Sequence, residues 1–114
     1  MALNKKNRLT RKKDFEEVFK KGKAVYGVFL LIRFLKKENE EEPKFAFPVS
    51  LKISKKAAER NKIRRILSET ARLNLSKISK GFESVIISKP NIINQNAEII
   101  RADLLNALKK ARIL

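Results

Sequence analysis

The chain contains neither cysteine nor histidine. Without cysteine, disulfide bonds, disulfide-linked partners and thiolate metal sites are excluded. Because both residues are absent, general acid–base and nucleophilic catalysis near neutral pH have few candidate side chains. The acidic residues are scattered or gathered in one polar segment, with no spacing that would bring carboxylates together around Mg²⁺. These absences favour a binding protein over an enzyme that acts alone.

Long apolar runs and negative charge are also scarce. No run of about 18 apolar residues occurs, and residues 1–6 lack the apolar centre of a signal peptide. We therefore expect no membrane span and a cytoplasmic location. Only 12 Asp and Glu residues oppose 28 Lys and Arg residues, which gives a formal net charge of +16 in 114 residues. So many positive charges repel one another in a compact chain, which indicates that they serve to bind a polyanionic partner.

Hydrophobic periodicity predicts one domain over residues 1–114, of fold class α+β, with a loose basic segment at residues 1–9. Helices are expected at 10–21, at 55–75 and from 94 or 96 to 112, and strands at 25–37, 44–53 and 82–88. Thr10 is expected to cap the first helix and Gly22 to end it, while Asn94 or Asn96 caps the last. Gly27 marks either a bulge or the true start of the first strand. The predicted architecture is an α-β sandwich in the order α-β-β-α-β-α.

The segment 55–75 combines one apolar stripe with a strongly cationic remainder. At about 100° per residue, the stripe consists of Ile63, Ile66, Leu67, Thr70 and Leu73. The remaining positions carry Lys56, Arg60, Asn61, Arg64, Arg65, Ser68 and Arg72. Arg60 and Arg64 lie one turn apart, so their guanidinium groups can bind neighbouring phosphates. A solvated surface helix is the ordinary alternative, but the concentration of arginine and the small number of interspersed acids favour a face that binds a polyanion.

Five motifs, in this order along the chain, resemble the bacterial ribonuclease P protein component. They are Arg8-Leu9, then Asp14-Phe15-x-x-Val18-Phe19-Lys20-x-Gly22, then Val49-Ser50-x-Lys52, then Arg60-Asn61-Lys62-Ile63-Arg64-Arg65 with Glu69, and finally Ile86-Ile87-x-Lys89-Pro90. Each motif is weak alone, but together they cover most of a basic chain of the expected length. The resemblance implies an α-β sandwich with a left-handed β-α-β crossover, whereas the general rule for such units is a right-handed one.

The same resemblance implies the protein subunit of ribonuclease P, which assists maturation of the tRNA 5′ end. The RNA subunit would then perform the hydrolysis with Mg²⁺, so no catalytic residue and no metal site are expected on the protein. The implied partners are ribonuclease P RNA and precursor tRNA, with no protein oligomer and no membrane. The positions that match the face toward the RNA subunit are Lys52, Lys55, Lys56, Arg60, Asn61, Lys62, Arg64 and Arg65. Those that match the site of the single-stranded 5′ leader, in a cleft between the first helix and the sheet, are Phe15, Phe19 and Lys89.

Some features leave alternatives open. Phe15 and Phe19 also fit the apolar stripe of their helix, so core packing is the alternative for both, and we expect Phe15 to be the more deeply packed. The chain has Ser68 and Leu51 where the family commonly has an arginine and a lysine, so the contact with RNA is expected to be weaker or shifted. The other functional classes considered are a ribosomal or other RNA-binding protein of similar fold, a polybasic membrane-surface protein and a self-contained nuclease.

Overall fold

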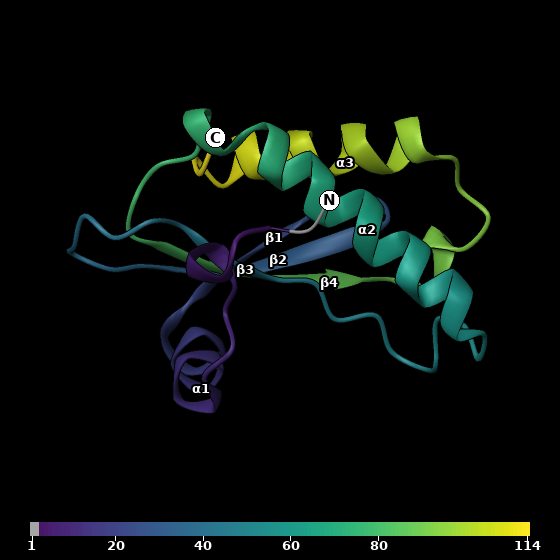
Figure 1. Cartoon of the computed structure of the whole chain (residues 1–114), viewed down its shortest axis with the longest axis horizontal. Helices are drawn as coiled ribbons and strands as arrows, with labels where there is room; N and C mark the ends of the chain where they lie inside the picture. Colours follow the sequence, from purple (N-terminus) through teal and green to yellow (C-terminus); the bar gives the residue numbers. More distant parts are fainter. Residues whose placement is uncertain (1–2) are drawn as a thin grey trace.

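The computed structural model describes residues 3–114 as a four-stranded sheet with helices on both faces (Figure 1). The helices are α1 (Lys12–Lys21), α2 (Ala57–Leu73) and α3 (Ala97–Lys110). The strands are β1 (Lys23–Tyr26), β2 (Leu30–Lys36), β3 (Lys44–Ala46) and β4 (Phe82–Ser88). Short 3-10 turns occupy Lys5–Asn7, Leu75–Lys77 and Pro90–Ile92. The predicted α+β class is confirmed.

The sheet has the strand order β1-β2-β4-β3. β1, β2 and β4 pair antiparallel, whereas β3 runs parallel to β4. α2 connects β3 to β4, so these three elements form the expected β-α-β unit, and the left hand of its crossover stays a prediction. Figure 1 shows α2 and α3 together on one face of the sheet and α1 on the other, near one end. This arrangement leaves part of the α1 face open.

The prediction of one strand over 25–37 is wrong, because the chain turns back between β1 and β2. The carboxylate of Asp103, on α3, accepts hydrogen bonds from the backbone N–H groups of Val28 (2.9 Å) and Phe29 (2.8 Å). A Cβ atom at Gly27 would lie only 2.8 Å from that carboxylate, so a larger residue there would displace the group that holds the turn. The apolar pattern did not reveal the turn, because the group that stabilises it is distant in the sequence. The element order is therefore α-β-β-β-α-β-α.

The prediction of a strand over 44–53 is correct only at its start. β3 ends at Ala46, and residues 51–53 form a turn in which the Ile53 N–H donates to the Ser50 carbonyl at 3.0 Å. Pro48 lacks an N–H group and cannot extend the ladder with β4. Phe45 and Val49 are buried as the alternation predicted, but Leu51 is exposed. The chain therefore leaves the sheet early and approaches α2 as an irregular connection.

Residues 3–9 are not loose, which corrects the prediction for that part of the segment; residues 1–2 lie outside the described residues. Leu3 and Leu9 are buried, and Arg8 forms a single parallel bridge with Phe45. The Leu9 N–H donates to the Phe45 carbonyl at 2.9 Å, and Asn7 Nδ2 donates to the Pro43 carbonyl at 3.0 Å. The segment thus lies along the outer edge of β3.

The helix ends follow the predictions in part. Gly22 ends α1 and its N–H donates to the Val18 carbonyl at 2.9 Å, while the Asn96 side chain caps α3 by accepting from the Ile99 N–H at 2.9 Å. Thr10 does not cap α1, because the helix starts one residue later and Arg11 occupies the cap position without a side-chain bond. α1 thus begins without the side-chain acceptor that usually satisfies its first N–H groups.

α1 is held on the sheet by a small apolar cluster and one ion cluster. Leu9, Val18 of α1 and Val85 of β4 are buried between α1 and the sheet, apart from the large core between the sheet, α2 and α3. Beside them, Lys37 Nζ lies 3.0 Å from Glu17 Oε1, 3.3 Å from Glu83 Oε2 and 3.8 Å from Asp14 Oδ1. Lys37 therefore joins two carboxylates of α1 to one of β4.

The carboxylates of this cluster differ in their surroundings. The hydrogen bond from Lys37 holds the pKa of Glu17 below its usual value, and the same bond raises the pKa of Lys37. Burial raises the pKa of Glu83 despite the nearby ammonium group, and Glu83 Oε1 has no hydrogen-bond partner among the described residues. The attachment of α1 therefore depends on the charge of Lys37.

Candidate nucleic-acid interface

The two sides of α2 are largely as predicted. Ile63, Ile66, Leu67 and Thr70 are buried against the core, but Leu73 is exposed. Leu73 is the last residue of the helix and lies roughly 90° from the centre of the buried stripe at 100° per residue. The other positions of α2, which are exposed or half-buried, carry the basic residues.

The structure brings the predicted RNA-facing residues to one end of α2. They belong to the first half of the helix or to the connection that leads into it from β3. Six of them are exposed and two, Arg60 and Arg64, are half-buried. The exposed residues are Lys52, Lys55, Lys56, Asn61, Lys62 and Arg65. The result is a cationic face, defined here as these eight residues, in which Glu59 is the acidic residue nearest the start of the helix.

Arg60 has a structural contact within this face. Its Nη1 donates to the Ser54 carbonyl at 2.9 Å, which ties the β3–α2 connection to the first turn of the helix. Ser54 Oγ in turn donates to Glu59 Oε1 at 3.0 Å and accepts from the Lys56 N–H at 3.1 Å. Substitution of Arg60 would therefore disturb the connection as well as remove a charge, so Arg60 is a poor probe of RNA binding.

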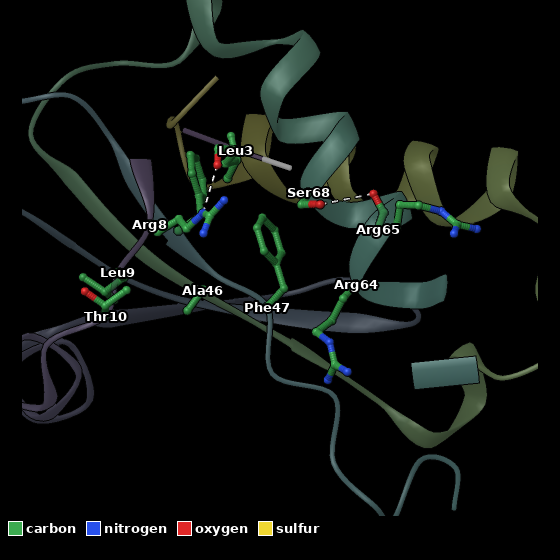
Figure 2. Close-up of a pocket in the computed structure, with 10 residues that line it drawn as sticks. Leu3, Arg8, Leu9, Thr10, Ala46, Phe47, Arg64, Arg65 and Ser68 are labelled. Carbon is green, nitrogen blue, oxygen red and sulfur yellow. Dashed lines mark hydrogen bonds between the residues drawn. The ribbon is translucent and has the colours of Figure 1, made fainter. Parts of the chain in front are cut away.

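Arg64 and Arg65 are better placed to contact a ligand. Arg64 Nη2 donates to the Asn61 side-chain oxygen one turn earlier, which orients the guanidinium group along the helix. Arg65 is exposed, and the two side chains leave α2 in different directions in Figure 2. A pair of neighbouring arginines directed this way can contact phosphates on either side of the helix.

A groove that the sequence did not predict lies beside these arginines. It has a volume of about 500 Å³ and opens between the N-terminal segment, β3 and α2 (Figure 2). Its lining residues are Leu3, Arg8, Leu9, Thr10, Phe45, Ala46, Phe47, Arg64, Arg65 and Ser68. The motif Arg8-Leu9 was recognisable in the sequence, but its pairing with β3 depends on contacts between distant segments.

The two phenylalanines of α1 differ in burial as predicted. Phe15 is half-buried against the cluster of Leu9, Val18 and Val85, whereas Phe19 is 46% exposed. The guanidinium carbon of Arg33, on β2, lies 5.8 Å from the centre of the Phe19 ring, and Arg33 Nη2 donates to the Phe19 carbonyl. Phe19 is thus an exposed ring held beside a cation, an arrangement suited to stacking on a base.

Lys89 follows β4 and lies on the same face of the sheet as Phe19 and Arg33, the face that α1 partly covers. Its Nζ donates to the Gly27 carbonyl at 2.8 Å and lies 5.6 Å from the centre of the Tyr26 ring, which is 61% exposed. In the pairing of β1 with β2, Tyr26 lies opposite Leu31 and Ala24 lies opposite Arg33. Because side chains alternate between the two faces along a strand, Tyr26 and Arg33 lie on the same face of the sheet, the one that α1 partly covers. Neither Tyr26 nor Arg33 was predicted as a site residue, since the β1–β2 turn that places them together was not predicted.

The described residues contain no group of three or more acidic residues that could hold a metal ion. Asp14, Glu17 and Glu83 come nearest, but the ammonium group of Lys37 lies among them. None of the helices in the described part of the chain is long and apolar enough to cross a membrane.

Comparison with known proteins gives consistent matches. A family model described as Ribonuclease P matches residues 3–112. The ribonuclease P protein component of Clostridium botulinum strain 657 is 33% identical over 110 residues, which cover 96% of this chain and 97% of the relative. That of Microcystis aeruginosa is 32% identical over 117 residues, covering 100% and 98%.

Solved structures agree with these matches. The RNase P protein of Thermotoga maritima has a TM-score of 0.80 at 31% identity, with 90% of this chain and 96% of that chain covered. The RNase P protein of Staphylococcus aureus has a TM-score of 0.87 at 23% identity, with 94% and 96% covered, and so supports the fold.

Proposed function

Since the chain belongs to the ribonuclease P protein family, and is thus the protein subunit of ribonuclease P in tRNA processing, we propose that it binds the RNA subunit through the cationic face of α2. The proposal rests on the concentration of lysine and arginine, exposed or half-buried, in the first half of α2 and in the connection that leads into it. Phosphate contacts of this kind supply affinity without reading sequence.

The second part of the proposal concerns the substrate. The open part of the α1 face carries Phe19, Arg33, Tyr26 and Lys89, which combine exposed rings with cations. Single-stranded RNA is bound by such combinations without strong sequence preference, because every base has a π-face. The single-stranded 5′ leader of precursor tRNA fits this surface.

The proposal also assigns the hydrolysis of precursor tRNA. The protein has neither histidine nor cysteine, and the carboxylates of Asp14, Glu17 and Glu83 surround the ammonium group of Lys37 instead of an open site for Mg²⁺. We therefore assign the hydrolysis to the RNA subunit with its Mg²⁺ ions. The protein contributes binding and positioning, and no step of the reaction is assigned to its side chains.

Replacing Phe19 with alanine is expected to weaken binding of precursor tRNA that carries a leader, and to leave the melting temperature nearly unchanged. The ring is 46% exposed, so little core packing is lost. A stacked base contributes about 1–3 kcal/mol, so the dissociation constant should rise roughly 5- to 150-fold. The measurement is the affinity of the assembled ribonucleoprotein for precursor tRNA with and without its leader.

Phe15→Ala is the matched control. Phe15 is half-buried in the cluster under α1, so its loss should lower the melting temperature, by less than the roughly 3–5 kcal/mol that a fully buried phenylalanine costs. If Phe19→Ala melts lower than Phe15→Ala, or weakens both substrates equally, Phe19 is a packing residue and the leader does not stack on it.

A further inference from the structure

The groove beside the cationic face has an apolar floor. Phe47 is half-buried, and its ring lies 6.0 Å from that of Phe45 at an angle of 14° between the ring planes. Phe45 is 2% exposed, so Phe47 is the ring that the groove presents, and Figure 2 shows it directed into the space between β3 and α2.

The rim of the groove is cationic. Arg8 and Arg64 contribute guanidinium groups, Arg65 lines the groove while its guanidinium group is directed away from it in Figure 2, and none of the ten lining residues is acidic. Arg8 Nε donates to the Leu3 carbonyl at 2.9 Å, so this single bond fixes the side chain at the edge of the groove. The hydroxyl groups of Thr10 and Ser68 also line it. The groove therefore combines an aromatic floor with donors that suit an anion.

From this combination we propose that the groove binds one unpaired nucleotide of the RNA subunit, with its base on Phe47 and its adjoining phosphates on the arginine rim. The inference rests on the proposed function, because the RNA that α2 binds is the RNA that supplies the nucleotide. A base is flat and apolar on its faces, while its phosphates are anionic, so a nucleotide matches both floor and rim. An apolar peptide segment would match the floor but gain nothing from the guanidinium groups of Arg8 and Arg64.

The inference has a distinct signature in the salt dependence of binding. Each phosphate contact releases counterions, so loss of a rim arginine flattens the plot of log affinity against log salt. Stacking releases none, so Phe47→Leu should weaken binding by the same factor at every salt concentration. The factor is roughly tenfold, as expected for one stacked base. Phe47→Tyr keeps the aromatic face and should restore most of the affinity.

The experiment measures affinity of the full chain for a bacterial ribonuclease P RNA and probes unpaired bases with dimethyl sulfate and a carbodiimide. Wild-type protein and Phe47→Tyr should protect one unpaired base that Phe47→Leu leaves reactive. Thr10→Trp, which fills the groove from its exposed rim, should also remove that protection. Leu73→Trp adds the same bulk at an exposed position of α2 outside the groove and should change nothing. Melting curves confirm that every variant is folded at the assay temperature.

Two failures can be told apart. If wild-type protein does not bind the RNA at all, the proposed function itself is contradicted. If it binds, but Phe47→Leu and Thr10→Trp bind as tightly and protect the same bases, the groove does not hold a nucleotide. The inference is equally overturned if Phe47→Leu changes the salt slope in the manner of an arginine substitution.

Discussion

Replacing Arg64 and Arg65 together with alanine should raise the dissociation constant for ribonuclease P RNA about a hundredfold. A hydrogen bond to a charged group contributes about 1.5–3 kcal/mol, or at least tenfold in affinity for each arginine. Arg65 is exposed and Arg64 half-buried, and neither belongs to the buried stripe of α2, so most of the core packing stays intact. The slope of log affinity against log salt should flatten by about two units, one for each lost phosphate contact.

Arg101→Ala provides the matched control for the arginine pair. Arg101 is exposed on α3, outside the cationic face, so its removal changes the net charge without removing a proposed phosphate contact. The comparison is made by titrating the RNA at several salt concentrations and melting each variant. Arg64 and Arg65 are structural residues if their loss lowers the melting temperature while the salt slope stays that of wild type. The proposed face is also wrong if Arg101→Ala alone weakens RNA binding by as much as half of the free-energy loss in the Arg64 and Arg65 double variant.

Replacing Lys37 with alanine is expected to lower the free energy of unfolding by about 2 kcal/mol at pH 7. The substitution leaves Asp14, Glu17 and Glu83 without their shared ammonium group. The cost should fall between the roughly 3–5 kcal/mol of a broken buried ion pair and the 0–1 kcal/mol of an exposed one. Glu83 is only 5% exposed but the other partners are more open, which places the cluster between these limits.

The loss caused by Lys37→Ala should depend on pH. Glu17 has a lowered pKa in the folded state, so its stabilisation is present above its ordinary pKa and is lost as the pH falls through the folded value. Lys37 has a raised pKa, so its contribution persists below its ordinary pKa and is lost only at high pH. Burial raises the pKa of Glu83 in the folded state. The protonated form of Glu83 is therefore the one that favours folding, and this contribution is largest at acidic pH. The difference between wild type and variant should therefore be largest near neutral pH and shrink below about pH 4.

Denaturant unfolding at pH 7 and at about pH 2.5, well below the ordinary carboxylate pKa, measures this difference, with Lys20→Ala as the control on the exposed side of α1. Since Lys37 holds α1 on the sheet, its loss should also reduce the preference for leader-bearing precursor tRNA, because Phe19 is on that helix. A loss of stability that is equal at both pH values would show that Lys37 acts by packing and not by charge.

The elements that the sequence predicted well are those whose signal is local. The 3.6-residue period of α2 placed Ile63, Ile66 and Leu67 in the core and the basic residues outside, and β4 has the bounds 82–88 that its apolar run indicated. Gly22 and Asn96 act as helix ends through side-chain and backbone chemistry within four residues. The family resemblance, carried by the same local motifs, is confirmed by the family match.

The features that the sequence did not predict depend on contacts between distant segments. The β1–β2 turn needs Asp103, and the ion cluster under α1 brings Lys37 to Glu17 and Glu83. The groove exists because the segment around Arg8 pairs with β3 and meets α2. In each case the residue types alone indicated no special role, because the role depends on contacts that form only in the folded structure.

The division of labour between protein and RNA can be decided by one assay, the cleavage of precursor tRNA at low Mg²⁺. RNA-free protein, a bacterial ribonuclease P RNA, and the two together are each incubated with precursor tRNA, and the released 5′ leader is measured. We predict no cleavage by the protein alone, little by the RNA alone at this Mg²⁺ concentration, and rapid cleavage at the mature 5′ end by the mixture. Processing by the RNA-free protein, or a mixture no faster than the RNA alone, would contradict the proposed role.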